Sequence, residues 1–324
     1  MRPAATLVIA ALCCSLAAAP YDAQAASYPD HPIKLIVPTA PGTIPDVTAR
    51  LVGERLAPLL GQPIVVENRP GAIGTIGLNA VAKAPPDGYT LGVLTTTYLA
   101  AVNLIPHMPY DPEKDLSPIG VVAWNYQILC VRSGLPVRSI PELIALAKSK
   151  PGALKYSTPG NATPSHLGMK LFEQQTGTEL VHVPYKGGSA AVTALLRGDV
   201  DIFLTGVLTI EPHVKSGAVR KIATIAPQRL AASPELPTLV ELGFPDLEYT
   251  DWQSIVAPAG TPPEVIERLR AALADIVARP EVKELLQQWS MEPAGLGPVE
   301  LKRLIHSEIQ RSGRLIHEAH ITTD

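Results

Sequence analysis

Several short loops in this sequence are rich in glycine, proline and hydroxyl side chains, which hold an anion without reacting with it. One runs from Pro38 to Gly42, and another is Thr158-Pro159-Gly160-Asn161. Glycine lets the backbone approach a ligand closely, while hydroxyls and free backbone N–H groups donate hydrogen bonds to negatively charged oxygens. These residue types therefore favour the binding of a small anion.

Side chains that could perform catalysis or bind a metal are poorly placed by comparison. Ser165 lies next to His166, but the sequence lacks a Gly-x-Ser-x-Gly nucleophile turn. An exported α/β enzyme is thus an alternative without a supporting motif. His317 and His320 lie three residues apart on an expected terminal helix, where two solvated histidines are the simpler interpretation. We expect no catalytic residue, no metal and no cofactor.

Gly71, Gly74 and Gly77 follow a strand, but their spacing differs from the Gly-x-Gly-x-x-Gly of a dinucleotide-binding loop. Close packing of a helix explains Gly77, whereas Gly74 at the helix start is open to either packing or ligand contact. Lys186 precedes a glycine pair without the Ser or Thr of a phosphate-binding loop. It is interpreted equally well as a phosphate contact or as a surface lysine.

These loops lie between short apolar strands and amphipathic helices. Such alternation predicts parallel sheets of the α/β class. Ligands of these sheets bind outside the carboxyl ends of the strands, where the following helices point their free N–H groups. The expected strands cover residues 33–37, 64–67, 89–94, 154–157, 181–184 and 200–204.

The mature chain is too long for one ordinary core, so we expect two lobes joined by a hinge. Its last part is helical by its apolar spacing, contains no further strand–loop–helix unit, and is expected to pack on the first lobe. The outgoing crossover is expected within 119–131 and the returning one within 249–257. Lobe 1 then comprises 27–122 with 254–324, and lobe 2 comprises 123–253.

The first 26 residues have the order of a secretory signal peptide. Arg2 precedes an apolar run over 7–19, and small residues end in Ala23-Gln24-Ala25. The run is shorter than the roughly 20 residues needed to span a bilayer. We therefore expect a cleaved signal and a periplasmic protein.

The positions of the cysteines and the net charge further limit the class of protein. Cys13 and Cys14 lie in the signal, so the mature chain keeps only Cys130 and has no disulfide framework. The net charge of −3 gives no basic surface for nucleic acid. A soluble two-lobed receptor for a small solute fits these properties.

Several longer stretches together resemble the solute-binding receptors of tripartite tricarboxylate transporters, often called Bug-type receptors. The similarity extends over essentially the whole mature chain, and the combination of stretches is specific where a single one would be weak. The stretches are Tyr28-Pro29, Ile33-Lys34-Leu35-Ile36-Val37-Pro38, Val66-Glu67-Asn68-Arg69-Pro70-Gly71-Ala72, Pro86-Asp87-Gly88-Tyr89-Thr90-Leu91, Val183-Pro184-Tyr185-Lys186-Gly187 and Ala257-Pro258-Ala259-Gly260-Thr261-Pro262.

The resemblance implies a type II-like periplasmic binding protein, each lobe a mostly parallel sheet flanked by helices. Its cleft would hold a small carboxylate through backbone N–H groups, hydroxyls and waters, for delivery to the membrane subunits of a transporter. Presentation of the ligand to a sensor kinase is an alternative that sequence cannot separate. We expect a monomer.

The first loop of the family carries an aromatic residue and a second glycine where this chain has Thr39 and Thr43, so the ligand's identity is left open. Trp124 and Tyr126, near the outgoing crossover, are expected either to form a wall for an aromatic ligand or to lie in the core. The candidate ligand-binding residues are Thr39, Pro41, Gly42, Thr43, Asp46, Gly74, Thr95, Thr96, Thr97, Tyr98, Ser157, Thr158, Gly160, His166, Tyr185, Lys186, Gly187 and Asp201.

Overall fold

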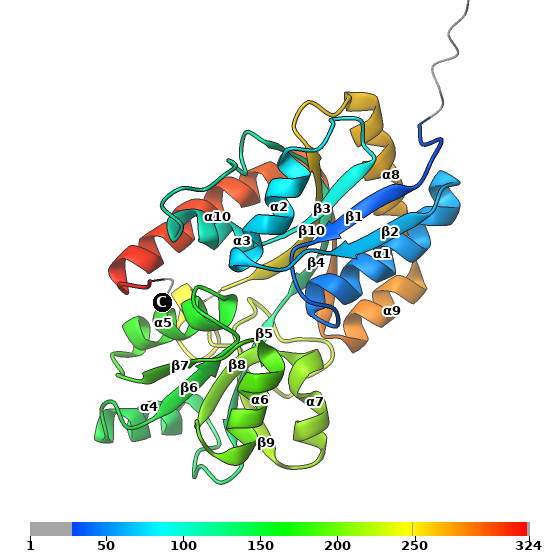
Figure 1. The fold of residues 1–324 in the computed structure, drawn as a ribbon. Helices are drawn as coiled ribbons and strands as arrows, with labels where there is room; N and C mark the ends of the chain where they lie inside the picture. The colour runs from blue at the N-terminus through cyan, green and yellow to red at the C-terminus, as the bar shows by residue number, and fades with distance from the viewer. Residues whose placement is uncertain (1–27, 248, 323–324) are drawn as a thin grey trace, which may run out of the picture.

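The computed structural model describes residues 28–247 and 249–322, and two β-sheets organise them into two lobes (Figure 1). The expected signal peptide and its two cysteines lie outside the described residues. The first sheet has the order β11-β4-β10-β3-β1-β2, with β1 (Ile33–Val37), β2 (Ile64–Asn68), β3 (Thr90–Thr95), β4 (Leu116–Asn125), β10 (Asp251–Pro258) and β11 (Met291–Leu296). The second has the order β7-β6-β8-β5-β9, with β5 (Gln127–Arg132), β6 (Lys155–Thr158), β7 (Val181–Pro184), β8 (Ile202–Gly206) and β9 (Val219–Thr224).

Helices cover both faces of each sheet, as expected for strands whose two sides are apolar. In the first lobe they are α1 (Ile44–Leu60), α2 (Thr75–Ala82), α3 (Thr96–Ala100), α8 (Pro263–Ala278), α9 (Pro280–Gln288) and α10 (Pro298–Glu318). In the second lobe they are α4 (Ile140–Ser149), α5 (Pro164–Thr176), α6 (Gly188–Arg197) and α7 (Val207–Lys215). Short 3-10 turns cover Ala72–Gly74, Ala101–Asn103 and Pro245–Leu247.

The predicted α/β class is confirmed. Strand β1 pairs in parallel with β2 and β3, and β6 pairs in parallel with β7 and β8. The strands that carry the chain between the lobes run the other way: β10 is antiparallel to β3, and β5 is antiparallel to β8. Each sheet is therefore parallel in its βαβ part and antiparallel at the hinge.

The expectation that the last segment contains no further strand–loop–helix unit is wrong, because β11 lies between α9 and α10. It pairs antiparallel with β4 at the edge of the first sheet, with a register shift between Pro293 and Leu296. Proline is tolerated on an edge strand, where its missing N–H costs no ladder bond. Pro293 and Gly295 are residue types that are uncommon in strands, so the sequence of this segment did not indicate one.

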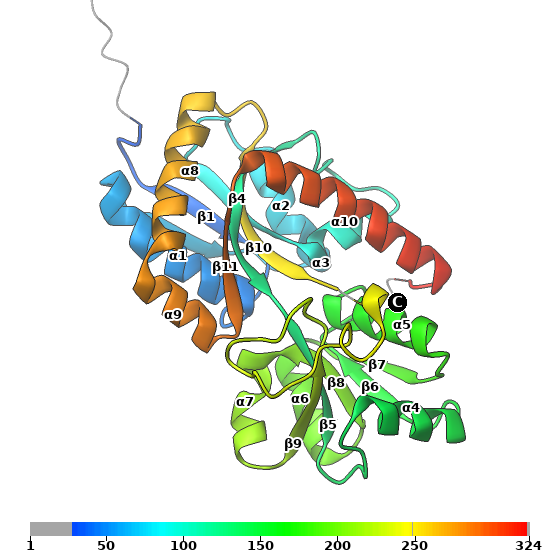
Figure 2. The same ribbon diagram turned by 180° about the vertical axis from the view of Figure 1, so that it is seen from behind.

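Helix α10 makes a further connection between the lobes, besides the two strand crossovers. Its first part belongs to the first lobe, where Leu301 and Ile305 pack in the core beside Trp252. Its last turn contributes Leu315 and Ile316 to the main core of the second lobe. Figure 2 shows α10 running along the back of the first lobe toward α5.

The remaining cysteine is structural. Cys130 lies fully buried in β5, and burial raises the pKa of its thiol to about 12. A thiol in such surroundings is unreactive. In the part of the chain that the structure describes, no helix is both long and apolar enough to cross a membrane.

Candidate functional site

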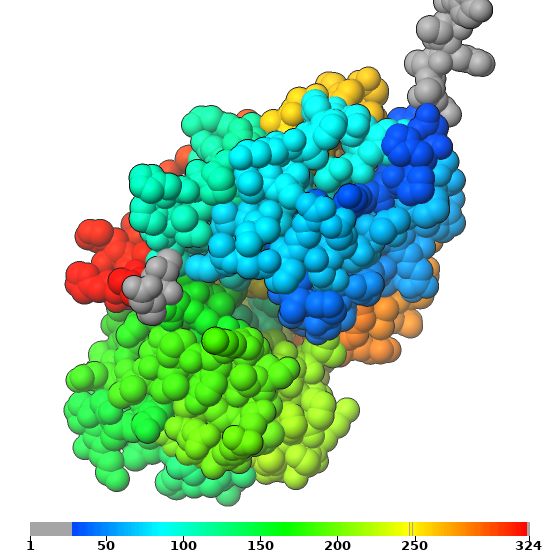
Figure 3. All heavy atoms as spheres, in the orientation of Figure 1, coloured from blue at the N-terminus to red at the C-terminus, as the bar shows by residue number. Residues whose placement is uncertain are grey.

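The carboxyl ends of the parallel strands in the two lobes face each other across the hinge. Thr95 at the end of β3 pairs with Gln253 near the start of β10, and Gly206 at the end of β8 pairs with Gln127 at the start of β5. Both strand ends therefore lie beside the crossovers. Figure 3 shows the molecule hollowed between the lobes on this side. The loops predicted to bind the ligand border this cleft.

Asp46 anchors the β1–α1 loop through its buried carboxylate. Its carboxylate accepts hydrogen bonds from Gly42 N at 2.8 Å, from Asn68 Nδ2 at 2.9 Å and from the Arg50 guanidinium at 2.9 and 3.1 Å. Burial alone raises the pKa of Asp46, but the hydrogen bonds from Arg50, Gly42 and Asn68 outweigh it and lower the pKa. Asn68 also donates to Thr39 O at 3.1 Å. The loop is thus held in shape by a charged network.

Thr43 is the N-cap residue of α1, yet it does not form the capping hydrogen bond. Its Oγ1 donates to Ala40 O at 2.9 Å instead, and it remains half-exposed at the cleft. The N–H groups in the first turn of α1 therefore keep their capacity to bind an anion. Pro41 and Gly42 are exposed on the same loop, and Gly42 has a φ of +80°.

Packing requires a glycine at Gly74, whatever contact its backbone makes with a ligand. A Cβ at this position would lie 2.3 Å from the Tyr98 ring. Burial raises the pKa of the Tyr98 hydroxyl, and the side chain of Thr39 acts in the opposite direction. The close approach of Gly74 therefore leaves room for the Tyr98 ring beside the start of α2.

The hydroxyls after β3 differ in role. Thr95 and Thr96 are buried, and Thr96 Oγ1 donates to the Asp251 carboxylate at 2.6 Å. Thr97 is half-exposed. Of the three threonines, Thr97 is the one best placed to meet a solute.

In the second lobe, Thr158 organises the loop after β6. Its Oγ1 donates to Gly160 O at 3.1 Å and is 2.7 Å from His182 Nε2. His182 stacks on His166, with ring centroids 3.8 Å apart. Ala162 N donates to His166 Nδ1 at 3.2 Å, so the histidine pair supports the loop from behind. Ser157 is fully buried beneath the loop.

The two histidines are held neutral by their surroundings. Burial, the neighbouring His182 and then Lys170 lower the pKa of His166 to about 3. Burial and Lys170 lower the pKa of His182 to about 4. At neutral pH both rings therefore act as uncharged hydrogen-bonding and stacking groups.

The β7–α6 loop completes the second lobe's side of the cleft. Gly187, with a φ of +98°, is the N-cap residue of α6, and its N–H donates to Pro159 O and Tyr185 O at 3.0 Å. A Cβ on Gly187 would meet no atom within 4 Å, so the space beside it is open. Tyr185 is half-exposed and Lys186 is exposed.

Asp201 does not belong with the other candidate residues. It precedes β8, at the end of the strand opposite the cleft, where it accepts from Arg132 Nε at 2.9 Å and from Lys155 N at 3.1 Å. The observed β8 begins at Ile202 rather than at Val200, but either start leaves Asp201 at the amino end. Its role is to tie three strand ends together.

Sequence reasoning missed a buried polar cluster at the hinge. Asn125 Nδ2 donates to the Asp251 carboxylate at 3.0 Å, and Gln253 Nε2 approaches the same oxygen at 3.4 Å. Burial raises the pKa of Asp251 against the opposing effect of the hydrogen bonds from Thr96 and Asn125. The sequence does contain a signal for this cluster, because each expected crossover includes a polar residue, Asn125 in one and Asp251 in the other.

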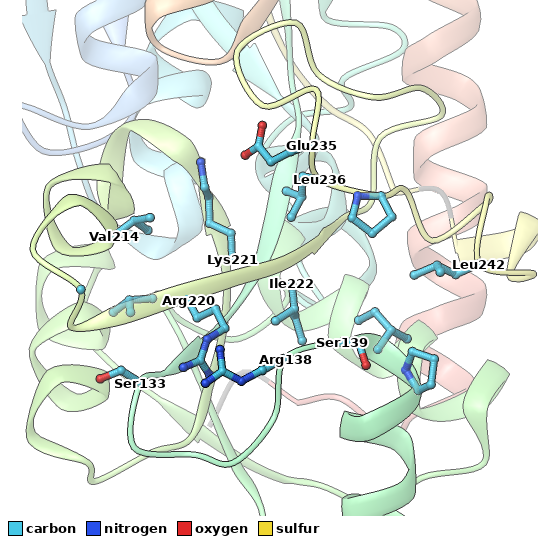
Figure 4. Close-up of a pocket in the computed structure, with 15 residues that line it drawn as sticks. Ser133, Arg138, Ser139, Val214, Arg220, Lys221, Ile222, Glu235, Leu236 and Leu242 are labelled. Atoms are coloured by element: carbon cyan, nitrogen blue, oxygen red, sulfur yellow. The ribbon is translucent and has the colours of Figure 1, made fainter.

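Two other concavities lie away from these loops. One of about 540 Å³ follows the edge strand β9, where Arg138 and Arg220 lie at one end and Lys221 and Glu235 at the other (Figure 4). Arg220 is tied to the carbonyl of Val137 at 2.7 Å. None of the candidate ligand-binding residues lines this cavity.

The second concavity, of about 250 Å³, lies between the crossovers and α10. Trp124, Tyr126 and Trp252 line it together with Glu308. These aromatic side chains therefore face α10, and Trp252 itself is fully buried.

The side chains considered above for catalysis or metal binding do not form such a site within the described residues. Ser165 Oγ donates to Leu204 O at 2.5 Å, so its hydroxyl is engaged by the backbone rather than by a base. Among residues 28–247 and 249–322, no group of three or more His, Cys, Asp or Glu side chains is arranged to hold a metal ion.

Gly74→Ala should weaken solute binding at least about tenfold and destabilise the fold by about 2 kcal/mol or more, because the new Cβ strains a left-handed residue and displaces Tyr98. Isothermal titration calorimetry and urea unfolding would measure the two effects. Gly61→Ala is the matched control, because Gly61 has a φ of +75° and a Cβ there would meet no atom within 4 Å. Equal effects in both variants would show that the Tyr98 contact does not position the loop.

Two α/β lobes, with glycine- and hydroxyl-rich loops facing each other across a double crossover, define a solute-binding receptor of the periplasmic binding protein class. Comparison with known families identifies which one. Residues 48–321 match the model of the tripartite tricarboxylate transporter family receptor, and the chain belongs to this family.

Relatives and solved structures agree with this membership. BugT of Bordetella pertussis is 35% identical over 303 residues, which cover 93% of this chain and 92% of BugT. Rpa4515 of R. palustris, solved with adipate, is 33% identical with a TM-score of 0.84, covering 91% of this chain and 99% of the other. MatC of Rhodopseudomonas palustris, with bound malate, is 30% identical with a TM-score of 0.79, covering 89% and 100%. The family and the fold are those of receptors rather than enzymes.

Proposed function

We propose that this chain captures a small carboxylate or dicarboxylate in the cleft between its lobes. The observation that carries the proposal is that α1, α5 and α6 each follow a parallel strand, so that they begin on the side of the carboxyl ends of β1, β6 and β7. Each start can stabilise a nearby negative charge by about 0.3 to 1 kcal/mol. Together with exposed glycines and hydroxyls they suit a carboxylate, whose oxygens accept hydrogen bonds from such groups.

The solved ligands of similar proteins support the same class, since adipate and malate are both small dicarboxylates. We propose that the cleft loops supply the contacts, and we exclude Asp201 from the set because of its position. The proposed ligand-binding residues are Thr39, Pro41, Gly42, Thr43, Thr97, Gly160, Tyr185, Lys186 and Gly187, supported from behind by Asp46, Gly74, Thr95, Thr96, Tyr98, Ser157, Thr158 and His166.

Capture is proposed to close the two lobes, 27–122 with 254–324 and 123–253, about the crossovers. The closed receptor, a monomer, would then deliver its solute to the membrane subunits of a tripartite transporter. Export with removal of the first 26 residues places it in the periplasm. Family membership supports these steps.

A binding carboxylate at 100 times its dissociation constant should stabilise the folded protein by roughly 2.7 kcal/mol, which raises the melting temperature by several degrees. Differential scanning fluorimetry with a panel of aliphatic and aromatic mono- and dicarboxylates measures this shift. The uncharged amide of each active acid, with every carboxyl group converted, is the matched control and should have no effect. A panel in which every acid leaves the melting temperature unchanged would refute carboxylate capture.

A further inference from the structure

Strand β9, at the edge of the second sheet, has an outer side with almost no strand partner. Its inner side pairs with β5. On the outer side, the described part of the chain supplies a single parallel bridge between Thr224 and Thr238. There Thr224 N donates to Pro237 O at 3.0 Å, and Leu239 N donates to Thr224 O at 2.9 Å. The outer edge therefore accepts an extended segment at its end, and residues 219–222 are left without one.

The concavity of about 540 Å³ follows this unpaired part of β9. Residues 219–222 all line it, together with the start of α4 and residues 235–237. Figure 4 shows Lys221 leaving one side of the strand and Arg220 and Ile222 leaving the other, as alternate residues of a strand do. The concavity is thus a groove along the edge of the sheet, where an added strand would lie.

The charges in this groove are unbalanced at one end. Neither the Arg138 nor the Arg220 guanidinium forms an ion pair with any residue that the structure describes. Lys221, in contrast, is 3.3 Å from the Glu211 carboxylate. The Glu142 carboxylate accepts from Arg138 N at 2.8 Å, so it serves the start of α4. Two positive charges without a counter-charge therefore border the unpaired strand edge.

Protection against aggregation explains only part of this arrangement. Charged side chains on an edge strand discourage pairing with other chains, and Arg220 and Lys221 could serve that purpose. Arg138 does not belong to the strand: it precedes α4 on the wall of the groove and adds a second positive charge there. The exposed Glu235 lies at the other end. The groove thus disfavours neutral and basic segments and favours an acidic one.

We propose that a partner protein adds an extended acidic segment to the outer edge of β9, with its carboxylates beside Arg138 and Arg220. In strand addition of this kind, main-chain hydrogen bonds supply affinity and side chains supply specificity. A segment as long as β9, with six residues, spans about 20 Å. None of the candidate ligand-binding residues lines the groove. This interaction is therefore independent of solute capture in the cleft.

Short peptides test the proposal on the full mature chain. The probe is the fluorescein-labelled, amidated hexapeptide Thr-Glu-Val-Glu-Val-Thr, whose two glutamates lie on one face of a strand. In fluorescence anisotropy it should bind with a dissociation constant below about 1 mM, at least about tenfold more tightly than the same peptide with two glutamines. Equal affinities, or no binding of the glutamate peptide up to about 1 mM, would overturn the proposal.

Methylation of the peptide backbone separates strand addition from simple attraction of charge. Alternate N–H groups of an added strand point toward β9. N-methyl groups on peptide residues 2 and 4, or on residues 3 and 5, should therefore abolish binding in one case and preserve it in the other. Retention of binding in both peptides would show that no ladder forms and would overturn the proposal.

Substitutions in the groove test the role of the arginines. Arg138→Glu should weaken binding of the glutamate peptide about tenfold or more, while leaving carboxylate-induced shifts in melting temperature unchanged. Arg220→Met, which keeps an unbranched stem, is a second variant that removes the other charge. Lys150→Glu, exposed at the far end of α4, is the control with the same change in net charge. An unchanged affinity in both arginine variants would overturn the assignment, as would sedimentation that shows a receptor dimer displaced by the peptide.

Discussion

Acidification from pH 6.5 to about pH 4.5 should cost the fold about 4 kcal/mol through His166 and His182 alone. Both imidazoles have a folded-state pKa, about 3 and about 4, below the usual 6.5. The unfolded chain therefore takes up protons first. The stability that the neutral rings contribute is fully present above pH 6.5 and is lost as the pH falls toward 4 and then 3.

The magnitude follows from about 1.4 kcal/mol per pH unit for each group. Two pH units below 6.5 give close to 3 kcal/mol for His166, which is 4% exposed. The half-buried His182 is assigned about half as much, because solvent screens its charged form. Asp251 and Glu308 act in the opposite direction, since burial raises the pKa of both carboxyls.

A double variant isolates the histidine contribution. His166→Asn keeps an acceptor for Ala162 N, and His182→Gln keeps a hydrogen-bonding group for Thr158, but neither replacement titrates. Urea unfolding at each pH should show a loss about 4 kcal/mol smaller in the double variant than in the natural protein. His317→Gln, at an exposed position on α10, is the control and should follow the natural protein. Parallel curves for all three proteins would contradict the prediction.

The same histidines connect stability to binding. His182 is hydrogen-bonded to Thr158, whose loop borders the cleft. Protonation of the stacked pair places two like charges 3.8 Å apart behind that loop. The receptor's affinity for its solute should therefore decline over the same acidic range as its stability.

The strand–loop–helix units were predictable because their signals are local. The apolar run of β1, the Pro-Gly loop and the helix starting at Ile44 follow one another within about 30 residues, and the same order recurs at β6 and α5. Thr163, for example, caps α5 by accepting from His166 N, as the Thr-Pro sequence predicts. Fold class needs no more than this alternation.

The features that sequence reasoning missed depend on contacts between distant residues. Asp251 meets Thr96 across 155 positions and Asn125 across 126, and no spacing rule connects such pairs. Gly74 resembled a ligand-binding glycine because the ring of Tyr98, 24 residues on, leaves no mark on the local pattern. Asp201 was misplaced for a related reason: a motif match gives no information about which end of a strand its residues occupy.

Glu308→Ala should destabilise the protein by about 3 kcal/mol, because this side chain joins α10 to the returning crossover. Glu308 is 2% exposed. Its carboxylate accepts from Tyr249 OH at 2.9 Å and pairs with the Arg311 guanidinium, which lies 4.2 Å from the centre of the Tyr249 ring. Removing it takes the acceptor from the buried Tyr249 hydroxyl and the carboxylate from Arg311.

A double-mutant cycle within the triad of Tyr249, Glu308 and Arg311 distinguishes the loss of these contacts from a general destabilisation of α10. Tyr249→Phe alone should cost about 1 kcal/mol, and combined with Glu308→Ala it should add little, because one hydrogen bond is lost in either case. Urea unfolding of the single and double variants measures the coupling energy. Arg314→Ala, at an exposed position of the same helix, is the control and should change stability by less than about 0.5 kcal/mol. Additive losses from Tyr249 and Glu308 would show that the two side chains act independently. In that case apolar packing of Leu315 and Ile316, rather than the triad, would hold α10 against both lobes.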